Sequence, residues 1–203
     1  MRIYLAGPEV FLADAAAIAA AKKAICAQHG LTGIFPTDHP DHAPAGYEPD
    51  WFRLYLANEA HIRSCDALIA NLTPFRGPSA DPGTVYELGL MRGLGRPVLG
   101  YSNTTARFGS RTLAALGLSA RRRPDGAWED AEGMQVEDFD LHDNLMLDGG
   151  IRAAGGVFET AAVPPAERWR DLTAFTRCVM AAARLLRDRP PMPGGTRPGA
   201  ASP

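Results

Sequence analysis

The sequence has few cysteines, and their placement excludes several kinds of protein. Only three occur in 203 residues, and they lie far apart as Cys26, Cys65 and Cys178. No two have the C-x-x-C spacing of a zinc or redox motif, and an odd number does not predict a disulfide framework. Free, mostly buried thiols in a cytoplasmic protein are the simplest interpretation.

Long hydrophobic runs and an excess of one charge are also missing. The longest alanine-rich stretch, residues 13–27, is interrupted by Asp14, Lys22 and Lys23, so we do not expect it to cross a membrane. The chain has 21 basic and 23 acidic residues, a balance that does not favour nucleic-acid binding. Its first residues enter a strand-like pattern, RIYLA, without the layout of a signal peptide.

Motifs for cofactors and metals are absent too. No G-x-G-x-x-G or P-loop sequence occurs, which disfavours nucleotide cofactors and kinase chemistry. The loop at residues 38–42, DHPDH, carries possible ligands but no rigid scaffold to hold a metal. Ser79 and Ser110 lack evident histidine and acidic partners for a hydrolase triad. We therefore expect neither a cofactor nor a metal.

Short apolar segments alternate with helical segments along the chain, and this order is typical of a parallel sheet. Strands are expected at residues 2–6, 34–35, 67–72, 97–101 and 155–158. Helices are expected at residues 10–28, 51–64 and 85–93, within 103–117, from 142, and at 164–188. The polar residues 119–132 predict an exposed loop, and the Pro- and Gly-rich residues 189–203 a disordered tail after a single domain, 1–188.

This order predicts an α/β fold: a three-layer doubly wound sheet, flavodoxin-like or Rossmann-like. We expect about five mostly parallel strands with helices on both faces.

The most informative stretch is residues 65–89, CDALIANLTPFRGPSADPGTVYELG. A buried strand, a loop and a helix opening at Gly83 would place Asp81 and Glu87 at the carboxyl end of that strand, where open α/β sheets bind ligands. A helix N-terminus favours an ionised carboxylate. Two carboxylates can break a glycosidic bond, so the stretch favours an enzyme acting on an N-glycoside. The alternative is that Asp81 is a helix cap and Glu87 a solvated helix residue.

Three segments resemble the nucleoside 2-deoxyribosyltransferase family, in its purine-preferring, protozoan-like branch. They are Ile3-Tyr4-Leu5-Ala6-Gly7-Pro8 with Phe11, the stretch 65–89, and Asn144-Leu145-Met146. Their order and spacing also match, from residue 2 to about residue 187, so only the tail falls outside the resemblance.

The resemblance implies a role for each matching residue. Glu87 would be the nucleophile, forming a covalent 2-deoxyribosyl ester as the base leaves. Asp81 would hydrogen-bond the nucleobase and shuttle its proton, and Tyr4 would orient Glu87 unless it is merely core. Substrate-binding roles would fall to Gly7, Pro8, Phe11, Asp38, Asn58, Gly83, Asn144 and Met146.

The resemblance further implies shared active sites. Asn144 would reach a neighbouring subunit's site and bind the sugar 5′-hydroxyl there, unless it simply caps a helix. Met146 would help to form the shared wall, so we expect a homodimer or a higher homo-oligomer. The substrates would be small molecules, 2′-deoxynucleosides and free nucleobases.

Two other functions stay open. N-glycoside hydrolases of nucleoside 5′-monophosphates resemble the family in fold and nucleophile, but usually hold the phosphate with serines after the first strand. Here that loop reads Gly7-Pro8-Glu9-Val10, and we expect Glu9 to repel a phosphate, although Arg76 or the arginines at 121–123 offer a contact. A non-catalytic nucleotide sensor is the weaker alternative, because it would not need Glu87 as a nucleophile.

Overall fold

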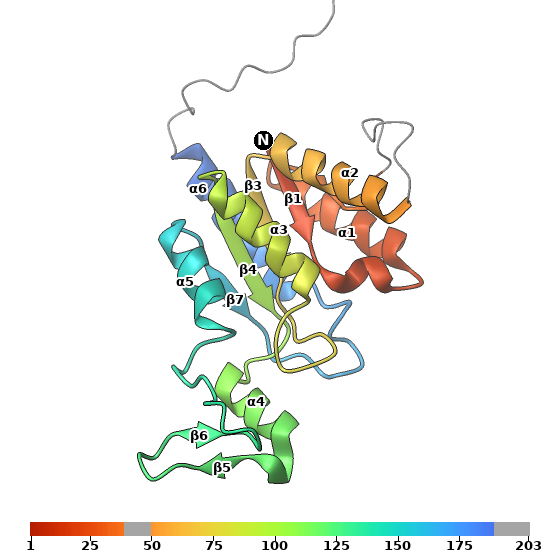
Figure 1. Ribbon diagram of the computed structural model, residues 1–203. Helices are drawn as coiled ribbons and strands as arrows, with labels where there is room; N and C mark the ends of the chain where they lie inside the picture. The colour runs from red at the N-terminus through yellow and green to blue at the C-terminus, as the bar shows by residue number, and fades with distance from the viewer. Residues whose placement is uncertain (39–49, 189–203) are drawn as a thin grey trace, which may run out of the picture.

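A five-stranded parallel sheet forms the centre of the protein in the computed structural model, which describes residues 1–38 and 50–188 (Figure 1). The strands are β1 (Arg2–Ala6), β2 (Thr32–Ile34), β3 (Ala67–Asn71), β4 (Val98–Ser102) and β7 (Phe158–Thr160). Their order is β2-β1-β3-β4-β7, and all four neighbouring pairs are parallel. This is the flavodoxin-like order of a doubly wound sheet, so the expected α/β fold is confirmed.

Helices cover both faces of the sheet. One face carries α1 (Ala15–Gln28) and α6 (Thr173–Arg187). The other carries α2 (Asp50–Ser64), α3 (Pro82–Gly93) and α5 (Leu145–Ala153). The alternation of side chains along β1 supplies both cores: Ile3 and Leu5 pack in the first cluster, and Tyr4 and Ala6 in the second.

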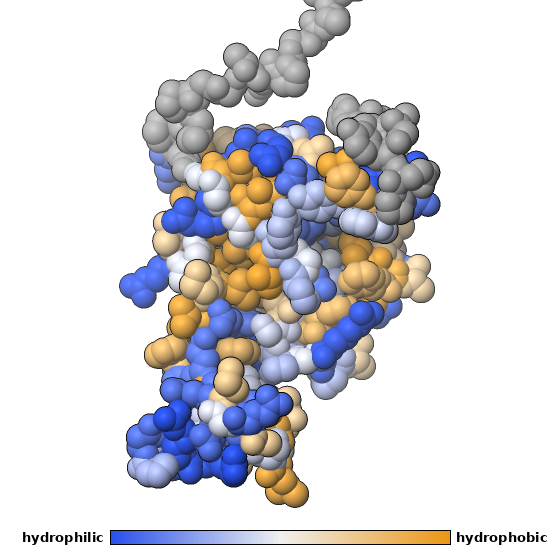
Figure 2. Space-filling view, viewed as in Figure 1, coloured by the Kyte–Doolittle hydropathy of each residue, from blue (hydrophilic) through white to orange (hydrophobic). Residues whose placement is uncertain are grey.

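An insertion projects beyond the carboxyl ends of the strands, at the bottom of Figure 1. It contains α4 (Phe108–Leu116), the short 3-10 helix η2 (Gly117–Ser119) and an antiparallel hairpin of β5 (Arg121–Arg122) and β6 (Trp128–Glu129). The prediction of a plain loop at 119–132 was therefore wrong. The hairpin turn places Gly126 at a φ of 88°, where glycine is favoured. The surface over the hairpin β5–β6 is mainly hydrophilic on the face shown in Figure 2.

Three helices begin later than the sequence predicts. Residues Pro8–Phe11 form a separate 3-10 helix, η1, and α1 starts only at Ala15. The helix expected from residue 142 starts at Leu145 as α5. Residues 164–172, expected to be helical, form turns and irregular chain before α6. Asn103 explains the late start of α6, because its amide donates to the carbonyl oxygens of residues 168 and 171 and holds this segment against β4.

The second strand also differs from its predicted position at 34–35. The strand β2 pairs Thr32, Gly33 and Ile34 with β1, whereas Phe35 is buried without joining the ladder. The apolar character of Phe35 thus reflects core packing and not strand pairing.

The three cysteines, Cys26, Cys65 and Cys178, are free and buried, as expected. Within residues 1–38 and 50–188 no helix is both long and apolar enough to cross a membrane. The same residues contain no group of three His, Cys, Asp or Glu side chains suited to a metal. Most of the DHPDH loop and the tail from residue 189 lie outside the described residues.

A buried ion pair joins the first loop to the sheet. Glu9 in η1 and Lys22 in α1 are each 1% exposed and form this pair. The Oε1 atom of Glu9 also accepts hydrogen bonds from Asn71 Nδ2 at 2.8 Å and Tyr101 Oη at 2.9 Å. The Lys22 ammonium lies 5.2 Å from the ring centre of Phe175 in α6. Glu9 is therefore internal and paired with a cation, so the expectation that it repels a substrate phosphate was wrong.

We expect Lys22→Met to be strongly destabilising, because it leaves the Glu9 carboxylate buried without a cation. The loss should be about 3–5 kcal/mol in the free energy of unfolding measured by urea denaturation. Arg170→Ala is the control: it removes the exposed Asp14–Arg170 pair and should cost less than about 1 kcal/mol. Equal losses in the two variants would contradict the structural importance of the buried pair.

Candidate active site

Tyr4 and Glu87 meet near the carboxyl edge of the sheet. Tyr4 lies on β1 with no exposed surface, and Glu87 is on the second turn of α3. The Tyr4 hydroxyl donates a hydrogen bond to Glu87 Oε1 at 2.6 Å. Helix α3 begins close to the ends of the strands (Figure 1), and Pro82 occupies its first turn, where a missing N–H is tolerated. One oxygen of the glutamate is thus held, while Oε2 forms no hydrogen bond to the described residues.

The environment of Glu87 makes its carboxyl group titrate near neutrality. Its pKa is raised to about 7: burial has the largest effect and raises it, the hydrogen bond from Tyr4 lowers it, and the charge of Asp81 raises it. The expectation that the helix N-terminus keeps this carboxylate ionised was therefore incomplete, because burial is the larger effect. Burial and Glu87 also raise the pKa of Tyr4 far above its ordinary value, so Tyr4 stays a hydrogen-bond donor.

Asp81 is the N-cap of α3. Its Oδ2 atom accepts hydrogen bonds from the Thr84 amide at 2.9 Å and from the Thr84 hydroxyl at 3.0 Å. The alternative interpretation of Asp81 as a cap is thus confirmed, but the cap uses one oxygen, and Oδ1 has no hydrogen bond to the described residues. A Cβ at Gly83 would lie 3.1 Å from Oδ2, so a side chain there would crowd the carboxylate.

The loop after β1 is closely packed. A Cβ at Gly7 would lie 2.1 Å from Glu9 Oε2 and 2.9 Å from Asn71 Cβ, so only glycine fits. Pro8 is buried directly after it and begins η1. The buried ion pair of Glu9 therefore sets the path of this loop beside Tyr4.

An aromatic stack borders the same edge of the sheet. Phe11 is 61% exposed and stacks on Phe75, with ring centres 5.6 Å apart and planes 12° apart. Phe75 also meets Trp169 edge-on at 6.0 Å. The Arg76 guanidinium lies 4.6 Å from the Phe75 ring centre and 5.5 Å from that of Phe11. Phe11 thus packs on Phe75 and also exposes ring surface to solvent.

Two expected binding residues have other surroundings. Asp38 follows β2, where its carboxylate pairs with Lys23 and accepts a hydrogen bond from the Phe35 amide at 3.0 Å. Asn58 is half-buried on α2. Neither side chain forms a hydrogen bond, within the described part of the chain, to the tyrosine and the two carboxylates above.

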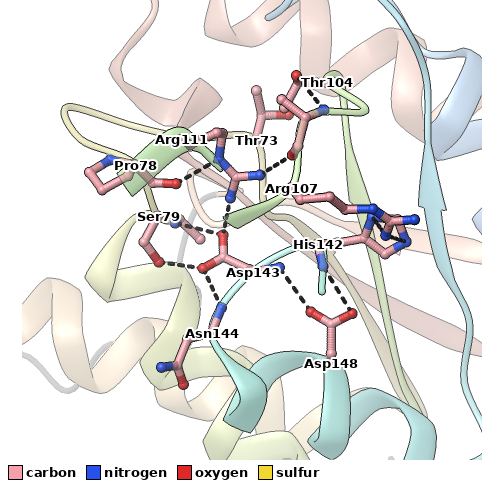
Figure 3. A network of polar contacts seen from close by, with 12 residues as sticks. Thr73, Pro78, Ser79, Thr104, Arg107, Arg111, His142, Asp143, Asn144 and Asp148 are labelled. Carbon is pink, nitrogen blue, oxygen red and sulfur yellow. Dashed lines mark hydrogen bonds and ion pairs between the residues drawn. The ribbon is translucent and has the colours of Figure 1, made fainter. Parts of the chain in front are cut away.

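A buried carboxylate that sequence reasoning missed links the loop before α3 to the segment before α5 (Figure 3). Asp143 has no exposed surface and accepts hydrogen bonds from Ser79 Oγ and the Ala80 amide. It pairs with Arg111 at 3.3 Å and accepts from the Asn144 amide at 2.8 Å. No local sequence motif predicts the role of Asp143, because most of its partners come from distant parts of the chain.

Asn144 and Met146 begin α5. Asn144 is the N-cap, and its Oδ1 accepts from the Met146 amide at 3.1 Å, so the interpretation as a cap is confirmed. Its Nδ2 donates to Glu137 Oε2 at 2.7 Å, and Glu137 Oε1 accepts from the Leu145 amide at 2.6 Å. Met146 is 71% exposed, so its side chain is available for contact outside this chain.

The fold and site define a flavodoxin-like α/β protein with two carboxylates and a buried tyrosine at the carboxyl edge of its sheet. The model of the nucleoside 2-deoxyribosyltransferase family matches residues 3–146, which is more than half of the chain. The protein belongs to this family and is an enzyme of this type.

Individual relatives agree with the family match. The uncharacterized protein C191.05c of Schizosaccharomyces pombe is 30% identical over 166 residues, which cover 76% of this chain and 78% of that protein. The 2-desoxiribosyltransferase from Leishmania mexicana is 33% identical, with a TM-score of 0.53 over 72% of this chain and 84% of that one. A conserved protein from Enterococcus faecalis V583 is 18% identical, with a TM-score of 0.50 over 89% of this chain and 97% of that one, and supports the fold alone.

We expect Glu87→Gln to stabilise the protein more at pH 8 than at pH 5. The pKa of Glu87 rises from 4.5 to about 7 on folding, so the native state binds the proton more tightly and loses stability as pH rises between these values. A neutral glutamine escapes this loss, which is at most about 3 kcal/mol. Urea denaturation at both pH values measures the difference, and an equal effect at pH 5 and pH 8 would contradict the raised pKa.

Proposed function

We propose that this enzyme transfers 2-deoxyribose between the nucleobases of 2′-deoxynucleosides, through a covalent ester on Glu87 and with retention at C1′. The observation that carries the proposal is the half-buried Glu87 side chain beside the carboxylate of Asp81: Tyr4 holds its Oε1, and its Oε2 has no hydrogen bond to the described residues. A nucleophile and a proton-transfer group are the two parts that a retaining displacement needs.

In the first half of the reaction, Oε2 of ionised Glu87 attacks C1′ as the C1′–N bond breaks. The electron pair of that bond goes to the base nitrogen, and protonated Asp81 supplies a proton to the base, so a neutral base leaves. The oxocarbenium-like transition state is stabilised by the glutamate charge, and its collapse gives the deoxyribosyl ester. Tyr4 holds the other carboxylate oxygen throughout.

In the second half, the nitrogen of an incoming base attacks C1′ and the ester bond breaks. The electron pair returns to Glu87, and the proton of the incoming base passes to Asp81. The two inversions give net retention, and both residues return to their initial states. Exclusion of water from the ester decides whether a base or water accepts the sugar.

The resemblance to the family assigns the substrate contacts to further residues. Gly7 and Pro8 form the floor under the sugar, and the exposed ring of Phe11 stacks on the base. Asn144 and exposed Met146 complete the site of a neighbouring subunit, so the active species is at least a two-fold dimer.

Hydrolysis of nucleoside 5′-monophosphates uses the same first half-reaction and is the alternative. The paired, buried state of Glu9 removes one argument against it. The 5′ group of the substrate therefore has to be tested directly.

Base exchange is tested by chromatography after incubation with 2′-deoxyinosine and adenine. We expect 2′-deoxyadenosine and hypoxanthine from the wild type, and a loss of about 1,000-fold or more in Glu87→Ala, because the nucleophile is gone. A circular dichroism spectrum like that of the wild type is the control for folding. Wild-type turnover by Glu87→Ala would overturn the proposal. Hydrolysis of deoxyinosine monophosphate without any exchange would favour the hydrolase.

The pH dependence of kcat/KM for base exchange should reflect Glu87. We expect activity to fall as pH rises through the pKa of about 7, because the reactive state needs one proton on the pair, carried by Asp81 while Glu87 is ionised, and this proton is lost above that pKa. Tyr4→Phe removes a hydrogen bond that lowers this pKa, so the fall should move to higher pH. Asp81→Asn removes the group that carries the proton, so the fall should disappear. A profile that rises through this pH range, or a fall that is unchanged in Asp81→Asn, would contradict this assignment.

A further inference from the structure

The start of α5 is occupied by the chain's own side chains. Five consecutive amides, residues 142–146, each donate to a side-chain oxygen. Asp148 accepts from residue 142 at 3.4 Å and from residue 143 at 2.9 Å, as Figure 3 shows. Asp143 accepts from residue 144 at 2.8 Å, Glu137 from residue 145 at 2.6 Å, and Asn144 from residue 146 at 3.1 Å.

Free amides at a helix N-terminus attract phosphate groups, because they point outward at the positive end of the helix dipole. Here carboxylate and amide oxygens already fill these positions. Of the carboxylates, Asp143 is paired with Arg111. Glu137 forms no ion pair within the described part of the chain, so its negative charge at this helix end is not balanced by a direct partner.

Glu137 also fixes the orientation of the Asn144 amide. Its Oε2 accepts from Asn144 Nδ2 at 2.7 Å, which directs the amide oxygen of Asn144 toward the helix. A carboxamide has two N–H donors and an oxygen with two lone pairs, so one donor and one lone pair stay available. A neutral hydroxyl can use both, whereas a phosphate would approach the negative charge of Glu137.

The insertion holds Glu137 in this place. The preceding residue, Val136, is buried, and its amide donates to the carbonyl oxygen of Trp128 in β6 at 2.7 Å. The carboxylate of Glu137 then bridges Asn144 and Leu145. The hairpin thus positions a charge at the start of α5.

We infer that Glu137 is a specificity-determining residue, which orients Asn144 toward a substrate 5′-hydroxyl and rejects a 5′-phosphate. The inference rests on the proposed function, in which Asn144 meets the sugar 5′ end in a neighbouring subunit. Glu137 acts through Asn144 and through its charge, so it is a positioning residue and not a catalytic one.

The test compares Glu137→Gln with the wild type, using 2′-deoxyinosine and its 5′-monophosphate as separate substrates with adenine as acceptor. The glutamine side chain retains one acceptor oxygen and lacks the charge. We expect KM for the nucleoside to rise about fivefold with kcat within about twofold, because ground-state positioning is lost. The preference for nucleoside over monophosphate, as a ratio of kcat/KM values, should fall at least about tenfold. Glu132→Gln, at an exposed position of the same insertion, should leave both quantities unchanged.

Each outcome separates the two hypotheses. An unchanged preference in Glu137→Gln, with base exchange intact, would overturn the inference and leave the proposed function standing. An equal loss on both substrates, accompanied by a lower melting temperature, would show a purely structural role and also overturn the inference. Absence of base exchange in the wild type would overturn the proposed function and, with it, the inference.

Discussion

The arrangement of this site depends on one buried carboxylate, Glu9, and its ion pair with Lys22. The carboxylate lies between the first loop, α1 and the ends of β3 and β4, because its hydrogen bonds come from Lys22, Asn71 and Tyr101. A buried charge requires partners at all of these places at once, so it constrains how the elements can pack. The same carboxylate leaves no space for a side chain at Gly7. It therefore constrains the path of the loop that follows β1, the strand of Tyr4.

Glu87 illustrates how burial can serve chemistry at the expense of stability. Removal from water makes its ionised form unfavourable, and the hydrogen bond from Tyr4 only partly offsets this effect. A poorly solvated carboxylate is a better nucleophile, while a pKa near neutral pH permits the ionised form to be populated. Asp81 differs from Glu87 in its partners, because its Oδ2 accepts from the amide and the hydroxyl of Thr84 at the start of the same helix.

Asp143 and Glu137 connect this chemistry to the less regular second half of the chain. Asp143 binds the residues before Asp81 and the amide of Asn144, so the two loops are positioned together. Glu137, which follows the hairpin in the chain, accepts hydrogen bonds from Asn144 and Leu145 at the same helix start. Under the proposed function, the insertion therefore bears on substrate recognition.

Local patterns in the sequence determined the sheet and its principal carboxylates. The apolar run after Cys65, the loop that follows it and the helix start at Pro82 are short-range features, and they placed Asp81 and Glu87 correctly relative to the sheet. Tertiary structure decided the rest. Glu9 is paired and internal because Lys22, Asn71 and Tyr101 surround it, and α6 starts at Thr173 because Asn103 holds the preceding turns. Asp143 and Glu137 gained their roles from partners on separate elements. The physical reason is that burial and hydrogen bonding depend on neighbours in space, which local periodicity and residue type do not specify.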